Sequence, residues 1–178
     1  MWWATLGFIV IEGAMFAMLI ATAVYLRGVE PDWPPNTYAP PDLFWGTLNT
    51  AILLASVVPN HLLKKATHAL DLRGVQRWLL VQNGFAVAFL VVRAFEFGAL
   101  GVRWDSNAYG SIAWFVLGFH TLHLLTDAAE SAVLTFWMFQ NPGPRRFEDV
   151  SEECIYWDFV VLVWLPLYAV LYWLPRWT

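Results

Sequence analysis

Five stretches of this chain are both apolar and long enough to cross a lipid bilayer, and this feature limits the fold more than any other. An α-helix rises about 1.5 Å per residue, so about 20 apolar residues span the hydrocarbon core. The predicted helices cover about Trp2–Leu26, Leu43–Leu63, Val75–Leu100, Tyr109–Phe139 and Glu153–Leu174. We therefore expect an all-α membrane protein in which residues 1–178 form a single transmembrane domain.

The composition excludes a soluble domain. Hydrophobic residues make up 59% of the 178 residues and charged residues only 13%, whereas about 25% of a typical soluble domain is charged. A soluble domain of this length has no core large enough to bury so much apolar surface, so the excess must face lipid. The charged residues form no basic patch, and we therefore expect no nucleic-acid partner. The single cysteine, Cys154, excludes an intramolecular disulfide.

Prolines and short charged runs separate the predicted helices. The first link, residues 27–42, contains five prolines and cannot be helical throughout. Residues 64–74, 101–107 and 141–151 are predicted as the other links. Pro166 falls inside the last predicted helix, where we expect a kink.

Lysine and arginine predict the orientation in the membrane. With an odd number of spans, the N-terminus, the second link and the fourth link lie on one side. We assign six of these residues to that side and three to the other. The two sets are Lys64, Lys65, Arg73, Arg77, Arg145 and Arg146 against Arg27, Arg103 and Arg176. Because basic residues favour the cytoplasmic side, we expect a cytoplasmic N-terminus and a C-terminus outside.

Ionisable side chains inside the predicted spans are the first candidates for function. A polar group that faces hydrocarbon has no water to bond, so it must face protein, a cofactor, a bound head group or internal water. The candidates away from the ends of the spans are Glu12, Arg93, Glu96, His120, His123, Asp127, Glu130 and Asp158.

Four of these residues share one face of the fourth predicted helix. At about 100° per residue, His120, His123, Asp127 and Glu130 fall within roughly 80° of each other around the helix axis. Asp158, on the fifth predicted helix, is expected at a similar depth to Asp127 and Glu130. Three neighbouring carboxylates cannot all be ionised cheaply, so at least one should be protonated or matched by a cation.

Three interpretations of these residues remain open. In the first, the fourth-helix residues and Asp158 are polar packing residues, and the two histidines bond to carboxylates such as Glu96 or Asp158. In the second, Glu12 exchanges protons or binds an amine head group, with Arg93 and Glu96, which can pair at i,i+3 spacing, as further candidates. In the third, the His120 and His123 face ligates a metal in a membrane enzyme.

Read in order, the segments resemble subunit III of the haem–copper oxidases. Tyr-Gly-Ser at 109–111 and Gly-Phe-His-Thr-Leu-His at 118–123 are similar to the family's YGS…GFHGLH pattern. Trp-Pro-Pro at 33–35 and Leu-Asn-Thr at 48–50 are similar to its WPP…LNT pattern. Glu12 stands where the family has its membrane-embedded glutamate.

Two further elements continue the resemblance, with departures. Ala-Phe-Glu-Phe at 94–97 resembles the family's xxEY element, and residues 156–164 resemble its YWHFVDxVW element. Here Asp158 replaces the family's histidine, Val161 replaces its aspartate, and Asp127 replaces a glycine. Asp127 and Asp158 then offer carboxylates to the two histidines.

The resemblance implies the family's five-helix form, with its helices in two groups, in the bacterial inner membrane. It implies a non-catalytic subunit that stabilises the catalytic subunit I, binds phospholipid and supports proton uptake. No redox cofactor is then expected in this chain, and haem and copper are expected in partner subunits. The alternatives are a subunit-III-like accessory protein of nitric oxide reductase or of another respiratory complex, and the metal-dependent enzyme described above.

Overall fold

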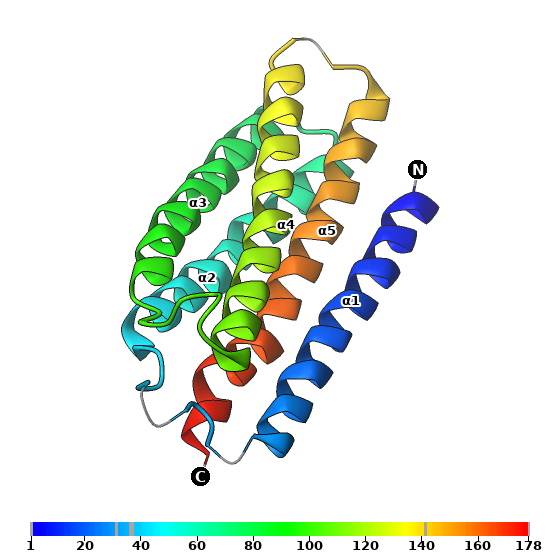
Figure 1. The fold of residues 1–178 in the computed structure, drawn as a ribbon. Helices are drawn as coiled ribbons and strands as arrows, with labels where there is room; N and C mark the ends of the chain where they lie inside the picture. The colour runs from blue at the N-terminus through cyan, green and yellow to red at the C-terminus, as the bar shows by residue number, and fades with distance from the viewer. Residues whose placement is uncertain (1, 31, 36–37, 141, 178) are drawn as a thin grey trace.

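The computed structural model describes residues 2–30, 32–35, 38–140 and 142–177, and every regular element within these ranges is a helix (Figure 1). The five long helices are α1 (Trp2–Val29), α2 (Leu43–His68), α3 (Leu72–Gly98), α4 (Ala108–Met138) and α5 (Pro144–Tyr168). All five are long and apolar enough to cross a membrane, which confirms the predicted all-α class with five spans. Pro31 and Asn141, both in predicted links, lie outside the described residues.

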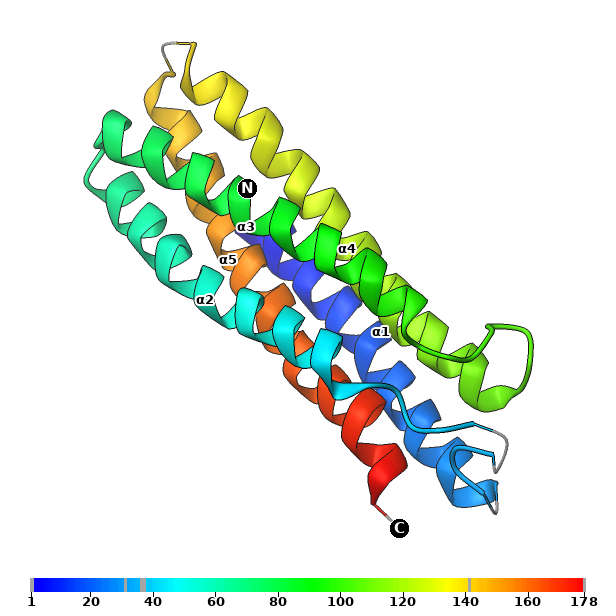
Figure 2. The ribbon, with the colours of Figure 1, turned by 90° about the vertical axis from the view of Figure 1, so that its left-hand side faces the viewer.

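Helices α2 to α5 form an antiparallel four-helix bundle, and α1 packs against it from outside. Within the bundle, α3 lies between α2 and α4, and α5 closes the ring by packing on both α4 and α2 (Figures 1 and 2). Helix α1 contacts α4 and α5 and buries only two of its side chains, Phe16 and Ala23. The start of α1 lies toward the end of the molecule that carries the α2–α3 and α4–α5 links. The C-terminus lies at the other end (Figure 1).

Side-chain caps fix the starts of two helices. The Asp42 carboxylate accepts a hydrogen bond from the backbone N–H of Phe44 at 3.2 Å, at the start of α2. The Asn107 side-chain oxygen accepts from the backbone N–H of Gly110 at 2.7 Å, at the start of α4. Each cap satisfies a backbone donor that has no partner inside the helix.

Helix α5 begins nine residues before its predicted start at Glu153, because it begins at Pro144. A proline is favoured in the first turn of a helix, where its missing N–H is not needed. The first turns of α5 are rich in charged residues, and the pattern of apolar residues therefore predicts a link there.

The irregular part of the last span follows Pro166. Helix α5 continues through Pro166 to Tyr168 and then passes into a π-helical turn at Ala169–Trp173 and a 3₁₀ turn at Leu174–Arg176. The regular α-helix continues past Pro166. Pro175 follows the π-helical turn and, because it has no N–H, cannot bond the Leu171 carbonyl four residues before it.

Candidate functional site

Arg93 and Glu96 form a closed polar network inside the four-helix bundle. Arg93 Nη1 lies 3.3 Å from Glu96 Oε2, so the two residues pair as their i,i+3 spacing predicts. Glu96 also accepts hydrogen bonds from Asn49 Nδ2 at 2.7 Å and from the Tyr172 hydroxyl at 2.5 Å. All four side chains are buried. This arrangement is suited to holding α2, α3 and the end of the last span together.

His120 lies on the other side of the Arg93 guanidinium. Its Nε2 is 3.1 Å from the carbonyl oxygen of Val160, which can only accept, so Nε2 carries the hydrogen. Its Nδ1 is 3.3 Å from Arg93 Nη2 and accepts from it. The guanidinium also lies over the rings of Trp164 and Phe89, with its carbon 4.2 Å and 4.6 Å from the ring centroids. These contacts assign a neutral imidazole to His120.

A second polar group joins α1, α4 and α5. Glu12 Oε2 accepts a hydrogen bond from the Tyr156 hydroxyl at 2.8 Å, and Glu12 Oε1 lies 3.5 Å from His123 Nε2. His123 Nδ1 is 2.6 Å from the carbonyl oxygen of Phe119 and must donate to it. A neutral His123 therefore presents an unprotonated Nε2 to Glu12.

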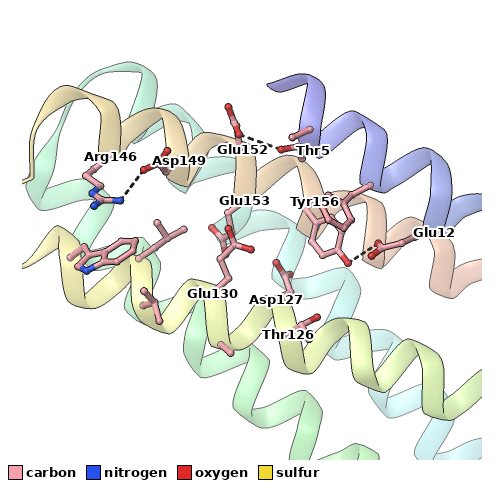
Figure 3. A pocket seen from close by; sticks show the side chains of 16 residues that line it. Thr5, Glu12, Thr126, Asp127, Glu130, Arg146, Asp149, Glu152, Glu153 and Tyr156 are labelled. Atoms are coloured by element: carbon pink, nitrogen blue, oxygen red, sulfur yellow. Dashed lines mark hydrogen bonds and ion pairs between the residues drawn. The ribbon is translucent and has the colours of Figure 1, made fainter. Parts of the chain in front are cut away.

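A pocket of about 860 Å³ lies beside this second group, between α1, α4 and α5 (Figure 3). Its walls are partly apolar, with Phe8, Val133, Leu134 and Trp137 among them. Six carboxylates also line it, from Glu12, Asp127, Glu130, Asp149, Glu152 and Glu153. The lining includes one basic side chain, Arg146.

Two of the carboxylates in this pocket are almost completely buried. Asp127 is 2% exposed and Glu153 is 3% exposed. Among the described residues, Asp127 has no hydrogen-bond partner, and for Glu153 only the Ser131 hydroxyl lies near enough to donate. Because an ionised group away from water is costly unless it is paired, this pocket is suited to holding protons or a cation.

Asp158 does not join Asp127 and Glu130, contrary to the expectation from sequence. Its Oδ1 accepts a hydrogen bond from Asn60 Nδ2 at 2.7 Å, between α5 and α2. Asp158 lies five positions after Glu153, which is about 140° around the helix axis, so the two carboxylates of α5 face different neighbours. Glu96 and Asp158 are not the partners of the histidines: His120 contacts Arg93 and the Val160 carbonyl. His123 does face a carboxylate on a neighbouring helix, that of Glu12, at 3.5 Å.

The stripe predicted on the fourth helix is thus divided among three environments. His120 belongs to the closed network, His123 faces Glu12, and Asp127 and Glu130 line the pocket. In the described part of the chain, no group of three or more histidine, cysteine, aspartate or glutamate side chains is placed to share a metal ion. The geometry therefore gives no support to the metal interpretation.

Glu153 and Tyr156 were not identified from sequence as site residues. They belong to a face of α5 with polar residues at i, i+3, i+4 and i+7, namely Asp149, Glu152, Glu153 and Tyr156. This spacing is the signal that could have found them. It was missed because the helix was predicted to begin only at Glu153.

Comparisons with known proteins agree along almost the whole chain. A family model described as cytochrome c oxidase subunit III matches residues 3–176, a range that includes every residue lining the pocket. Cytochrome c oxidase subunit 3 of Thermostichus vulcanus is 30% identical over 174 residues, covering 96% of this chain and 86% of that protein. The same subunit of a Synechocystis strain is 29% identical over 168 residues, covering 93% and 72%. The probable cytochrome c oxidase subunit 3 of Mycobacterium tuberculosis H37Rv is 27% identical over 152 residues, covering 79% and 71%.

Proposed function

The chain belongs to the cytochrome c oxidase subunit III family, and from this membership we propose that it is the non-catalytic membrane subunit that stabilises the catalytic subunit of a respiratory haem–copper oxidase. The observation that carries the proposal is the family match over residues 3–176. Membership of the family implies that the redox centres lie in the catalytic subunit. Five apolar helices and relatives in cyanobacteria and mycobacteria support a multi-pass location in the bacterial inner membrane.

Purification of the tagged chain from its native membrane in a mild detergent tests this proposal. We expect a haem-containing partner to co-purify, and we expect the dissociated chain to contain no stoichiometric haem, iron or copper. An absorption spectrum and metal analysis of both fractions provide the measurement. Stoichiometric metal in the isolated chain, or the absence of any haem-containing partner, would contradict the proposal. Reduction of nitric oxide instead of oxygen by the co-purified complex would favour the accessory protein of nitric oxide reductase.

Within this function, the Glu12, His123 and Tyr156 group is our candidate for a role in proton uptake. The Glu12 carboxylate lies 3.5 Å from His123 Nε2, and the Tyr156 hydroxyl donates to it at 2.8 Å. The neighbouring pocket adds Asp127, Glu130 and Glu153 on the side nearer the N-terminus of α1 (Figure 3). The apolar part of the pocket wall supports the second proposed role, contact with phospholipid.

Glu12→Gln should lower the turnover of the purified oxidase while leaving its assembly unchanged. Glutamine keeps the size of the side chain and an oxygen that accepts from Tyr156, but it cannot exchange a proton. We expect a loss of about twofold to fivefold that grows between about pH 6 and pH 9, because proton delivery becomes harder as protons become scarce. Oxygen consumption at each pH is the measurement.

The matched control for this prediction is Glu148→Gln, which makes the same chemical change on an exposed side chain of α5 outside the pocket. It should leave turnover at the wild-type rate at every pH. If the Glu12 variant also kept the wild-type rate across this range, the role in proton uptake would be excluded and only a packing role would remain.

A further inference from the structure

Helix α1 carries Glu12 but has few fully buried side chains of its own. Of the residues of α1, all of which the structure describes, only Phe16 and Ala23 are buried. The turns of α1 that precede Glu12 border the pocket instead of packing closely on the bundle. The position of Glu12 relative to α4 and α5 therefore depends on the packing of the next turn, which contains Phe16.

Phe16 packs against both histidines of α4. The centroid of its ring lies 4.9 Å from that of His123 and 6.4 Å from that of His120, distances that are typical of favourable aromatic contacts. Phe16 follows Glu12 by four residues, so the two side chains lie one helical turn apart on the same face of α1. The His123 imidazole therefore meets the Glu12 carboxylate and the Phe16 ring together.

The two imidazoles offer the Phe16 ring an ordered surface, because each is oriented by hydrogen bonds that do not involve α1. His120 is bonded to side-chain and backbone groups of α3 and α5. His123 Nδ1 donates to the carbonyl oxygen of Phe119, in its own helix, at 2.6 Å. A ring that is fixed on this surface fixes the distance and the rotation of α1 at Glu12.

We propose that Phe16 is a positioning residue for Glu12. Its ring, packed against His123 and His120, holds α1 where the Glu12 carboxylate lies 3.5 Å from His123 Nε2 and accepts the 2.8 Å hydrogen bond from Tyr156. The proposal rests on the proposed role of Glu12 in proton uptake, and Phe16 itself exchanges no proton. Because proton transfer depends steeply on distance and orientation, a small shift of α1 would impair it.

The first experiment measures this geometry directly and needs no oxidase activity. In the purified full-length chain, labelled with ¹³C-glutamate and ¹⁵N-histidine, solid-state NMR reports the through-space contact between the Glu12 carboxyl carbon and His123 Nε2. The signal is assigned by its loss in Glu12→Gln. Phe16→Ala leaves a cavity where the ring packs, so the contact should be lost. An unchanged contact in Phe16→Ala would overturn the proposal.

Ile20→Ala is the matched control. It also truncates an apolar side chain of α1, one turn further along, that packs on the same apolar cluster as Phe16. It should keep the NMR contact at the wild-type intensity. If it lost the contact as Phe16→Ala does, any weakening of α1 packing would move Glu12, and the assignment to Phe16 would be wrong. Phe16→Val, a smaller truncation, should weaken the contact and provides the test if the alanine variant does not fold.

The turnover of the purified oxidase distinguishes positioning of Glu12 from general packing. Phe16→Ala should reproduce the loss expected for Glu12→Gln, about twofold to fivefold and growing between about pH 6 and pH 9. The double variant Phe16→Ala/Glu12→Gln should lose no more than Glu12→Gln alone, because two residues that act through one group are not additive. Losses that multiply in the double variant would contradict the proposal.

The two experiments distinguish failure of this proposal from failure of the proposed function. Loss of the NMR contact in Phe16→Ala with wild-type turnover would support Phe16 as the residue that positions Glu12, and it would refute the role of Glu12 in proton uptake. A wild-type contact in Phe16→Ala, together with reduced turnover in Glu12→Gln, would refute the positioning role of Phe16 and leave the proposed function intact.

Discussion

Replacing Arg93 by leucine should lower the free energy of unfolding by about 3–5 kcal/mol, because the change leaves a buried carboxylate without its cation. Arg93 and Glu96 are each 1% exposed, and their side chains lie 3.3 Å apart. The guanidinium also donates toward His120 and lies over Trp164, so the same change removes contacts to α4 and α5. The measurement is denaturant-induced unfolding of the purified chain in detergent, compared with the wild type.

An exposed charged pair, Arg103 and Asp105, supplies a matched control. Arg103 Nη2 lies 2.9 Å from Asp105 Oδ2, but these side chains are 78% and 40% exposed. Water solvates both groups when the pair is broken, so Arg103→Leu should not change stability measurably. If Arg93→Leu cost no more than Arg103→Leu, the buried network would have no role in stability.

Two further variants distinguish the destabilisation caused by the unpaired Glu96 carboxylate from that caused by the lost contacts of Arg93. Arg93→Leu/Glu96→Leu removes both charges and should destabilise less than Arg93→Leu alone, because no unpaired carboxylate remains. His120→Leu keeps the ion pair and removes only the bonds to Arg93 and to the Val160 carbonyl. We expect it to cost about 1–2 kcal/mol, the usual range for a hydrogen bond between helices in a membrane.

Gly46→Ala should destabilise the protein by about 1–3 kcal/mol, although alanine is normally the better helix former. A Cβ atom at Gly46 would overlap the ring of Tyr172, which is 1% exposed and donates a 2.5 Å hydrogen bond to Glu96. The ring cannot move aside without loosening that bond. Unfolding of the variant under the same conditions gives the measurement.

Gly84→Ala is the control for this substitution. Gly84 lies within α3, and a Cβ atom there would meet nothing within 4 Å. The change should therefore stabilise the helix by up to about 1 kcal/mol. We expect the free energy of unfolding to change in opposite directions in the two alanine variants. A change in the same direction would show that the Tyr172 ring moves aside at no cost in stability.

The residues of the closed network show where prediction from sequence succeeded. Arg93 and Glu96 were predicted to pair because i,i+3 neighbours share a helix face whatever surrounds the helix. Their other partners, Asn49, Tyr172 and His120, lie on other elements, and no local rule links those positions to α3. The pairing is a property of one helix, whereas the network is a property of four.

The pocket between α1, α4 and α5 shows where prediction from sequence was incomplete. Glu12, Asp127 and Glu130 were identified as candidates because each is an ionisable residue in an apolar span. The contributions of Glu153 and Tyr156 were not predicted, because the charged first turns of α5 hid where that helix begins. Asp158 was expected at a similar depth to Asp127 and Glu130, but it bonds to Asn60 on α2. Depth along a helix could be counted from the sequence, whereas the facing neighbour could not.

The sequence by itself determined that the chain crosses the membrane five times and that one face of α4 is polar, because the lengths of apolar runs and the helical period are local properties. Only the tertiary structure decided which side chain that face meets at each depth. His120 meets Arg93, His123 meets Glu12, and Asp127 opens onto a pocket. The physical reason is that the rotation and spacing of each helix are set by the packing of all its neighbours at once. The partner of a given side chain therefore depends on residues far away in the sequence.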